Sequence, residues 1–486
     1  MTTSEFFRKY WQDIVGGLAF ADVILVTISV CWILHIKRET MSAIAWCLTV
    51  ILIPFLGFFL FFLFGYQSIH GPVRKKKKKN KKYKRIVGDP AALARASREV
   101  TEKWEVLAKL AHNNGEGFPV TDGNRVALYH DGAPAFDAMI EAVRAAEHHV
   151  HLEFFIFRQD ATGRRFIDAL VAARTRGVEV RFAYDSVGSF TLSTRMFREL
   201  KRAGAKVAAF LPLFNPLYRL RVNLRNHRKL LIVDGRVAFS GGLNVGDEYL
   251  GLHKKFGPWR DTHFRVEGPA VESMQQVFLE DWHYAASEVV DGKAYFPPVP
   301  ELPGSALVQV VSSGPDADFK AVRETYFAAI TKAKDKLWIA SPYFVPDAGI
   351  RDALALAARS GVDVRLLGLF RPDKWLPFLA ARFYWTDMLA AGVKVYQYTP
   401  GMMHSKYMLV DGEWASVGSA NLDNRSLFLN YELNCLLYDP AAVAELEAEF
   451  QKDLDASVRL DKDVFSTRPW AGRMAENAAR LFSPVL

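Results

Sequence analysis

The hydrophobic pattern of the chain opens with two apolar stretches. Residues 14–36 hold Asp22 as their only charge, and residues 43–66 hold none. A membrane span needs about 20 mostly apolar residues, so both stretches are long enough to cross a bilayer. A cleaved signal peptide is the alternative for the first, but its apolar run is long and no small-residue cleavage site precedes the second. The pattern therefore predicts a two-helix transmembrane hairpin over residues 1–70.

Beyond about residue 117, strand-like apolar runs alternate with helical patterns. VHLEFFIF (150–157) and VEVRFAYDS (178–186) flank a helical pattern, as do KLWIASPYFV (336–345) and VDVRLLG (362–368). This alternation is typical of an α/β fold with a mostly parallel or mixed sheet. The similarity of IDALVAARTRGVEVR to RDALALAARSGVDVR indicates an internal repeat. We therefore expect two similar α-β-α halves around one active site, residues 118–295 and 296–486, with residues 71–117 as a basic linker and connector.

The positive charge is concentrated in one segment. Residues 74–85 (RKKKKKNKKYKR) hold ten of the 62 basic residues, which leaves 52 against 53 acidic residues elsewhere. Because basic and acidic residues outside this segment are nearly equal in number, the rest of the chain does not indicate a nucleic-acid-binding surface. Basic residues beside a span favour the cytoplasmic side, which predicts a cytoplasmic catalytic part. The segment is expected either to be a solvated linker or to lie on anionic lipid.

The three cysteines indicate no further type of site. Cys31 and Cys47 lie in the apolar stretches and Cys435 in a strand-like run. Their spacing gives neither a disulfide framework nor a zinc site. A reducing compartment suits the catalytic part.

A motif of His-x-Lys, four residues, Asp, six residues and Gly-x-x-Asn occurs twice. The first copy (225–244) supplies His227, Lys229, Asp234, Gly241, Gly242 and Asn244, and the second (402–421) supplies His404, Lys406, Asp411, Gly418, Ser419 and Asn421. In a strand, His and Lys two residues apart share a face. Lysine attracts phosphate oxygens, and asparagine adds neutral donors. Small residues at 242 and 419 would let further donors approach, so the motifs predict a phosphate-binding active site.

Two histidines suit the displacement of an alcohol from a phosphodiester without a metal. One imidazole can attack phosphorus while the other protonates the departing oxygen. Glu432 and Asp261 are candidates to orient the far ring nitrogens, the alternative being that both pair locally. His149, His151 and Glu153 would share one face of a strand and could imitate metal ligands, but the corresponding KLWIAS of the repeat is apolar. We expect no metal site.

Two insertions mix aromatic with basic residues, FNPLYRLRVNLRN (214–226) and FRPDKWLPFLAARFYW (370–385). Such segments are typical of the lipid headgroup boundary. A helix packed on the sheet would show the same composition, so the sequence leaves both interpretations open.

The doubled motif resembles that of the phospholipase D superfamily. Within it, NLRNHRKLLIVDGRVAFSGGLNVGDEYLG (223–251), FGPWRDTHFRVEGPAV (256–271), GSANLDNRSLFLNYELN (418–434) and the apolar residues 46–65 are similar to membrane-anchored bacterial cardiolipin synthases. The similarity covers nearly the whole chain but weakens at the lysine-rich segment and in the last twenty residues.

The resemblance implies transfer of a phosphatidyl group from one phosphatidylglycerol to another, which gives cardiolipin and glycerol. It implies a phosphohistidine on His227, acid/base catalysis by His404, and no nucleotide, metal or other cofactor. It also implies a multi-pass protein of the bacterial inner membrane that contacts anionic lipid.

Other functions share parts of this pattern. A hydrolytic phospholipase D, which would release phosphatidic acid, shares every catalytic residue. A membrane-anchored nuclease of the same superfamily would explain the lysine-rich segment, but the two predicted spans and the balanced charge argue against nucleic acid. A non-catalytic scaffold would not need two complete motifs. The sequence leaves open the use of phosphatidylethanolamine, the acyl-chain preference, accessory proteins and the oligomeric state.

Overall fold

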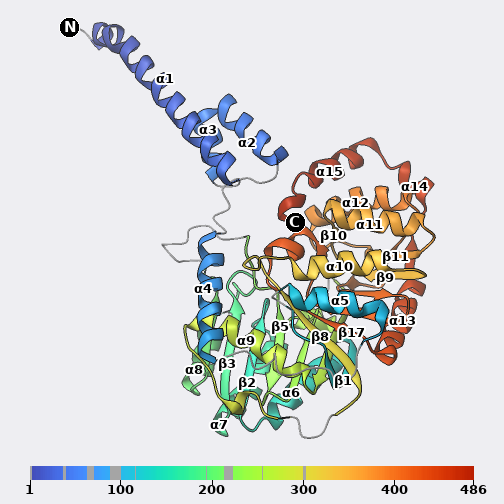
Figure 1. Ribbon diagram of the computed structural model, residues 1–486. Coiled ribbons are helices and arrows are strands. Elements are labelled where there is room, and N and C mark those ends of the chain that lie inside the picture. Colours follow the sequence, from blue (N-terminus) through green and yellow to red (C-terminus); the bar gives the residue numbers. More distant parts are fainter. Residues whose placement is uncertain are drawn as a thin grey trace. The chain divides into compact units, whose positions relative to one another are not determined.

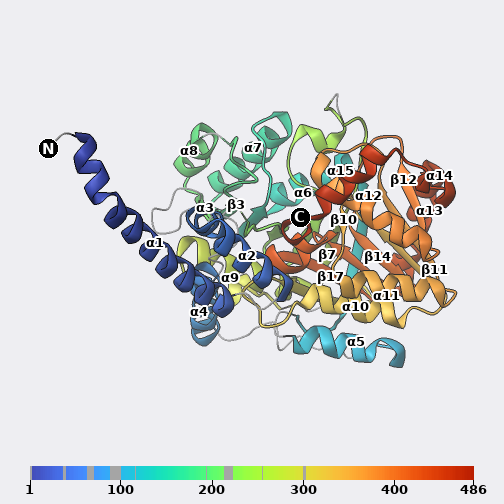
Figure 2. The ribbon, with the colours of Figure 1, turned by 90° about the horizontal axis from the view of Figure 1, so that it is seen from above.

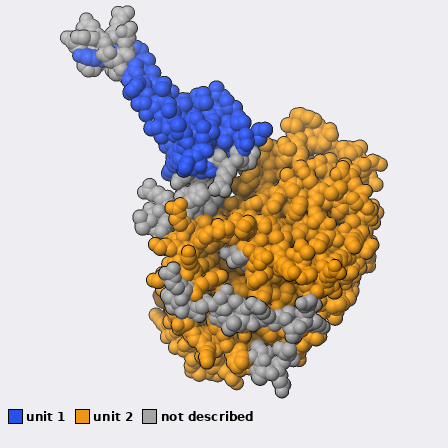
Figure 3. Space-filling model, viewed as in Figure 1, with its two compact units in different colours: residues 1–72 blue, residues 73–486 orange. Residues whose placement is uncertain are grey.

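A computed structural model describes residues 3–36, 40–62, 70–87, 100–114, 117–192, 194–212, 223–253, 256–298 and 303–486. The chain divides into two compact units, residues 1–72 and residues 73–486 (Figure 3). The first unit contains the apolar N-terminal helices. The second contains both copies of the motif.

The described residues up to Phe62 form three helices of the first unit: α1 (Thr3–Ile36), α2 (Thr40–Leu52) and α3 (Pro54–Leu60). They pack through a small apolar cluster in which Ile33, Val50 and Phe61 are fully buried. Residues Val15–Ile36 of α1 have a mean hydropathy of 2.2. Among the described residues, α1 alone is long and apolar enough to cross a membrane.

Among the described residues the second apolar stretch forms two helices, not one continuous helix, so its crossing of a membrane as the second arm of the hairpin stays a prediction. The helix breaks at Ile53, and Pro54 begins α3, as expected for a residue without an amide hydrogen. A Cβ on Gly57 would lie 2.5 Å from the carbonyl oxygen of Thr49, so α3 turns back closely against α2. The 13 residues of α2 extend only about 20 Å, against a hydrocarbon core of about 30 Å.

One large mixed sheet forms the centre of the second unit (Figure 1). Its strands run in the order β18-β12-β11-β9-β14-β15-β17-β8-β1-β7-β6-β5-β2-β3-β4. Their bounds are β1 (Thr121–Asp131), β2 (His149–Phe154), β3 (Glu179–Asp185), β4 (Lys206–Phe210), β5 (Lys229–Val233), β6 (Val237–Gly241), β7 (Trp259–Glu267), β8 (Ala306–Ser313), β9 (Lys336–Ala340), β11 (Asp363–Leu369), β12 (Lys394–Tyr398), β14 (Tyr407–Val410), β15 (Trp414–Gly418), β17 (Glu432–Leu437) and β18 (Ser457–Arg459). In addition, β13 (Met402–Met403) pairs with β7, and β10 (Phe344–Val345) pairs with β16 (Leu422–Asp423).

The strand order is symmetrical about the central β1–β8 pair. Outward from the centre, β1-β7-β6-β5-β2-β3-β4 repeats as β8-β17-β15-β14-β9-β11-β12. In each half, three strands are parallel and the strand that follows the motif histidine joins them antiparallel. The predicted α/β fold with two similar halves is confirmed.

Helices cover both faces of this sheet (Figure 2). Helices α6 and α7 lie on one side, and α9, α10 and α11 lie on the other. The helices of the second unit are α4 (His70–Val87), α5 (Glu102–Asn113), α6 (Gly132–Ala145), α7 (Ala161–Thr175), α8 (Thr194–Arg202), α9 (Ala270–Ala286), α10 (Ala321–Lys332), α11 (Ala348–Arg359), α12 (Trp375–Ala390), α13 (Pro440–Asp455), α14 (Lys462–Ser466) and α15 (Trp470–Arg480).

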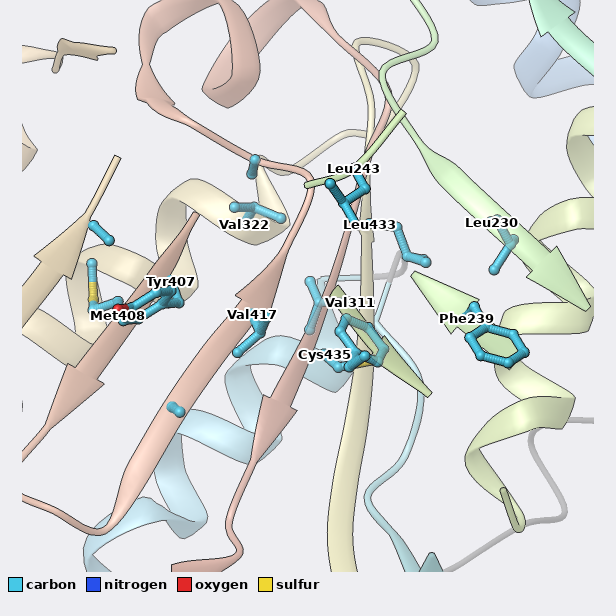
Figure 4. Close-up of a cluster of buried hydrophobic side chains, with 14 of the residues drawn as sticks. Leu230, Phe239, Leu243, Val311, Val322, Tyr407, Met408, Val417, Leu433 and Cys435 are labelled. Carbon is cyan, nitrogen blue, oxygen red and sulfur yellow. The ribbon is translucent and has the colours of Figure 1, made fainter. Parts of the chain in front are cut away.

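The core of the second unit runs continuously through both halves. Leu230 and Phe239 from the first half and Val417, Leu433 and Cys435 from the second are all buried in it (Figure 4). Because apolar burial stabilises roughly in proportion to area, this shared core holds the two copies of the motif in a fixed relation.

The lysine-rich segment forms helix α4, and its buried residues contradict the interpretation as a solvated linker, while contact of its exposed lysines with anionic lipid stays a prediction. Lys76 of α4 is only 2% exposed, and its Nζ lies 3.0 Å from Asp281 Oδ1 and 3.4 Å from Asp316 Oδ2. Tyr83 is buried as well, and its hydroxyl donates to the carbonyl oxygen of Val290. Part of the basic segment is therefore neutralised inside the fold.

Replacing Lys76 with methionine is expected to lower the free energy of unfolding by about 3 kcal/mol. The substitution leaves buried carboxylates short of a cation, which typically costs about 3–5 kcal/mol. Lys77→Met is the matched control, because Lys77 is 52% exposed in its pair with Asp318 and should lose at most about 1 kcal/mol. Denaturant unfolding of the full chain in detergent measures both. Equal effects of the two substitutions would show that the buried pair does not stabilise the fold.

The two insertions differ in their outcome. Residues 213–222, most of the first, lie outside the described residues. In the second, Phe378, Tyr384 and Trp385 are buried, so α12 is a helix packed on the fold. Its start remains open to solvent, with Trp375 68% exposed.

Candidate active site

The first motif histidine sits where β5 begins, next to a strand of the other half. The backbone amide of His227 donates to the carbonyl oxygen of Tyr431, 2.9 Å away. This bond places the imidazole Nδ1 3.0 Å from Glu432 Oε2, at the start of β17. The ring of Phe155 lies edge-on against the imidazole, with centroids 4.9 Å apart.

The second motif histidine has the equivalent environment. Short strand β13 pairs with β7, and the amide of His404 donates to the carbonyl oxygen of Arg260 at 2.7 Å. The imidazole Nδ1 lies 2.7 Å from Asp261 Oδ2. The indole of Trp259 packs near this ring, 5.1 Å between centroids.

The two orienting carboxylates are exchanged between the halves. Asp261 belongs to the first half and contacts the histidine of the second, whereas Glu432 belongs to the second and contacts the histidine of the first. Strands β7 and β17 occupy equivalent places in the repeat, so the exchange follows the symmetry of the sheet. Because each Nδ1 meets a carboxylate, each Nε2 is the nitrogen left for a substrate.

Both imidazoles are held in their neutral form. Burial lowers the pKa of His227 to about 4, although Glu432 opposes the shift. Burial and Lys406 likewise lower the pKa of His404 to about 4 against the opposing effect of Asp261. A neutral imidazole near pH 7 can act as a nucleophile or as a base.

The two buried motif lysines, Lys229 and Lys406, each act electrostatically on residues of the other copy of the motif. Burial, opposed by Glu432, lowers the pKa of Lys229 to about 7. Burial, opposed by Asp261 and Glu432, lowers that of Lys406 to about 8. Each ammonium group also lowers the pKa of the histidine in the other copy. The structure therefore brings the two motifs together in one positively charged site.

The residues at 242 and 419 lie against the carboxylates: Gly242 leaves room for Asp261 and Ser419 bonds to Glu432, while their role in holding phosphate stays a prediction. A Cβ on Gly242 would lie 1.9 Å from Asp261 Oδ1, which explains why this position is glycine. At the equivalent place, the Ser419 hydroxyl donates to Glu432 Oε2 at 2.5 Å, and Asn430 donates to Oε1 at 3.1 Å. The backbone amides of both positions donate to carbonyl oxygens of Thr262 and Leu433.

The two motif asparagines differ. Asn244 Oδ1 accepts from the amide of Ile156, and its Nδ2 donates to the Tyr249 hydroxyl. The oxygen and one of the two N–H groups of this amide are therefore used within the fold, and its contact with phosphate stays a prediction. Asn421 is 95% buried, and its Oδ1 has no partner among the described residues. Its contact with phosphate stays a prediction.

The motif aspartates lie away from the histidines, so their predicted place in the catalytic group is corrected. Asp234 accepts from the backbone amides of residues 147, 148 and 149. Asp411 accepts from the amides of residues 334, 335 and 336 and pairs with Lys103. Each aspartate follows its histidine by seven positions along a strand, about 23 Å at roughly 3.3 Å per residue. Both aspartates fasten neighbouring loops at the far end of the sheet.

The histidines of β2 form part of the packing against α9. His151 stacks on Phe278, and both His149 and His151 meet the amide of Gln275. Burial lowers the pKa of His149 to about 3. Within the described residues, no group of three or more His, Cys, Asp or Glu side chains is arranged to hold a metal.

Sequence reasoning missed the groups that enclose the two histidines. Phe155 and Trp259 flank the rings, and Asn430 supports Glu432. Trp259 stands two residues before Asp261 in the same strand, so the strand period could have indicated it. Phe155 comes from a different strand, and its place depends on tertiary packing.

Comparison with known proteins agrees with this geometry. Residues 139–282 and 326–454 match the family described as "Cardiolipin synthase, PLD-like domain", and residues 24–65 match "Phospholipase_D-nuclease N-terminal". The chain is 39% identical to a cardiolipin synthase of Alkalihalophilus pseudofirmus, over 99% of this chain and 96% of that protein. It is also 39% identical to cardiolipin synthase 2 of Bacillus anthracis, over 94% and 89%.

A solved structure shares the fold. The crystal structure of a phosphatidylserine synthase from Haemophilus influenzae matches with a TM-score of 0.59 at 16% identity, over 78% of this chain and all of that one. The doubled sheet and the paired motifs define a phospholipase-D-like enzyme. The chain belongs to the cardiolipin synthase family of these phosphatidyltransferases, which confirms the resemblance seen in the sequence.

Proposed function

We propose that this protein transfers a phosphatidyl group from one phosphatidylglycerol to a second, giving cardiolipin and glycerol. The observation that carries the proposal is the pair of buried imidazoles, each oriented by a carboxylate of the other half and flanked by buried lysines. This arrangement suits an anionic phosphodiester. The 39% identity to cardiolipin synthases over nearly the whole chain supports the choice of product.

In the first step, His227 Nε2 attacks the phosphorus and the bond to the glycerol oxygen breaks. His404 gives its proton to that oxygen, and glycerol leaves. The pKa of free His404 is lowered to about 4 by burial, so the incoming negative phosphate must favour its protonated form. Lys229 and Lys406 stabilise charge on the non-bridging oxygens.

In the second step, His404 removes the proton from a glycerol hydroxyl of the second phosphatidylglycerol. The resulting oxygen attacks phosphorus, the bond from His227 Nε2 to phosphorus breaks, and cardiolipin forms. Both steps exchange one phosphate ester for another, which needs no nucleotide. Glu432 holds the His227 ring and Asp261 the His404 ring in place for both steps.

The substrate and the location follow from the same argument. The balanced charge outside α4, and the burial of Lys76 within it, favour an anionic lipid over nucleic acid. We place α1 across the bacterial inner membrane and the second unit on the cytoplasmic side, since basic residues follow the apolar helices. A second crossing of the membrane would require α2 and α3 together, because α2 alone is too short to span the bilayer.

Product analysis tests the proposal. Purified full-length protein in vesicles of labelled phosphatidylglycerol should yield cardiolipin and glycerol in equal amounts. Phosphatidic acid without cardiolipin would instead identify a hydrolytic phospholipase D. Adding phosphatidylethanolamine to the vesicles would show whether that lipid also serves as an acceptor or donor.

Catalytic efficiency is expected to fall increasingly steeply as the pH rises above about 7. The pKa values of Lys229 and Lys406 are lowered to about 7 and about 8, so both ammonium groups lose their charge in the range just above neutrality. Each deprotonation should reduce kcat/KM by about tenfold per pH unit beyond its pKa, because kcat/KM reports the free enzyme. Rates on phosphatidylglycerol vesicles between pH 6 and pH 9.5 measure this. A flat profile to pH 9.5, with the fold intact by circular dichroism, would contradict it.

A further inference from the structure

Helix α15 buries a charge and exposes its apolar side chains. The buried residues of this helix are Glu476 and Ala479, whereas Trp470 is 70% exposed and Met474 46%. Leu481, directly after the helix, is 72% exposed. At helical spacing these three apolar residues share one face. A surface helix of a soluble protein normally has the reverse arrangement.

This orientation is fixed by specific contacts. Glu476 Oε1 accepts from Arg382 Nε at 2.7 Å, and its Oε2 accepts from Arg468 at 2.8 Å. The Arg480 guanidinium lies 4.5 Å from the centre of the Phe383 ring. Tyr384 donates to the Ser483 hydroxyl at 3.0 Å. These bonds attach α15 to α12 through its polar face, so its apolar face must point outward.

The segments next to this exposed face are connected to the second motif. Helix α12 begins with Trp375, 68% exposed, and Asp373 just before it acts electrostatically on the buried Lys406. Beyond α15, the carbonyl oxygen of Leu486 accepts from the amide of Arg425, in the segment that follows the second motif. In both views of the second unit, α12 and α15 lie side by side (Figures 1 and 2).

Two further exposed apolar side chains stand on segments that contact the rings beside the motif histidines. Phe190, 72% exposed, follows Gly188, where a Cβ would lie 2.8 Å from the ring of Phe155, the ring beside His227. Leu252, 66% exposed, follows Gly251, where a Cβ would lie 3.5 Å from the amide nitrogen of Trp259, whose ring is beside His404. Single exposed apolar residues are ordinary, but these stand on separate segments around one site. We call them the apolar rim, which comprises Phe190, Leu252, Trp375, Trp470, Met474 and Leu481.

Basic residues accompany the apolar rim. Arg473 and Arg480 lie beside the exposed face of α15, and Arg371 and Lys374 precede Trp375; all four are exposed. Tryptophan prefers the membrane interface, and basic side chains there attract anionic headgroups. The charge therefore matches an anionic bilayer better than an apolar protein partner.

We propose that the second unit docks on the bilayer through the apolar rim, separately from attachment by α1. Docking would place the active site against the headgroup layer, where a phosphodiester can enter while its acyl chains stay in the membrane. The inference rests on the proposed function for the identity of that lipid. It concerns a surface of the second unit, so it can fail while the reaction stands.

A fluorescent label at position 474 tests the contact. The full chain carries Cys31→Ser and Cys47→Ser with Met474→Cys, labelled with an environment-sensitive dye in phosphatidylglycerol vesicles. Lipids brominated in the acyl chains should quench this label at least about threefold more than one on Thr175→Cys, the last residue of α7. Equal quenching at both positions would overturn the proposal, whatever product the enzyme makes.

Kinetics of paired variants give the second measurement. Trp470→Ser with Leu481→Ser should lower turnover of vesicle phosphatidylglycerol about tenfold and leave cleavage of soluble bis(4-nitrophenyl) phosphate unchanged. Val464→Ser with Leu356→Ser is the matched control, since these residues are 71% and 58% exposed but lie outside the apolar rim. Equal losses on both substrates, or equal losses in both variants, would count against docking. Release of phosphatidic acid in place of cardiolipin would revise the proposed function and leave this comparison valid.

Discussion

Replacing His227 or His404 with alanine is expected to reduce cardiolipin formation by about 1,000-fold or more. Each ring supplies a bond or a proton that no neighbouring side chain can replace, and acid/base catalysis alone contributes about 100- to 10,000-fold. Both imidazoles are about 90% buried, so water should substitute poorly. Conversion of labelled phosphatidylglycerol to cardiolipin and glycerol measures the loss. His112→Ala, on the exposed side of α5, is the control and should keep full activity.

The same variants distinguish the two roles. With phosphorus-labelled lipid and an alkaline quench, which preserves phosphohistidine, His404→Ala should retain label on the protein and His227→Ala should retain none. The reverse result would exchange the roles of nucleophile and acid/base. Label on neither variant, with labelled native protein, would show that both rings are needed for the first step.

Changing Glu432 to glutamine or Asp261 to asparagine is expected to lower kcat by about 100- to 10,000-fold. An amide keeps the shape of the carboxylate but can present N–H to the ring Nδ1, which selects the wrong tautomer; the analogous change in the serine protease triad costs about 10,000-fold. Steady-state kinetics on phosphatidylglycerol vesicles measures the effect. The loss should appear in kcat more than in KM, because the lysines that attract the phosphate remain.

The controls for these variants are exposed carboxylates. Glu413→Gln and Asp318→Asn change side chains that are 52% and 75% exposed, and their activity should stay within about twofold of the native value. Losses below about fivefold for both Glu432→Gln and Asp261→Asn would show that ring orientation does not depend on the exchanged contacts. Matching unfolding temperatures would exclude a defect in folding.

The sequence predicted the fold from features that are local or periodic. Strand and helix alternation, the repeat and the spacing of the motifs depend on residues close together in the chain, and each emerged in the structure. The sequence also named Glu432 and Asp261 as candidates to orient the histidines, but it did not assign each to a ring, because Glu432 lies 205 residues from His227 and Asp261 lies 143 residues from His404. Only the folded sheet decides which carboxylate meets which ring.

Local chemistry also explains the corrections. The motif spacing grouped Asp234 with His227, but an extended strand carries residues seven apart to opposite ends. The composition of α4 indicated exposure, whereas Lys76 meets carboxylates supplied by distant segments. Pro54 was visible inside the second apolar stretch, yet hydropathy averages over a helix break that proline imposes.

The exchanged carboxylates make each half chemically incomplete. A polypeptide that carried only one copy would have a catalytic histidine without the carboxylate that orients it, and a carboxylate without the histidine that it orients. It could work only by pairing two molecules face to face across the edge where β1 now meets β8. In the duplicated chain the two halves are covalently linked, so they are always present in equal number. Each half is also free to diverge in sequence, as the equivalent residues Gly242 and Ser419 have done.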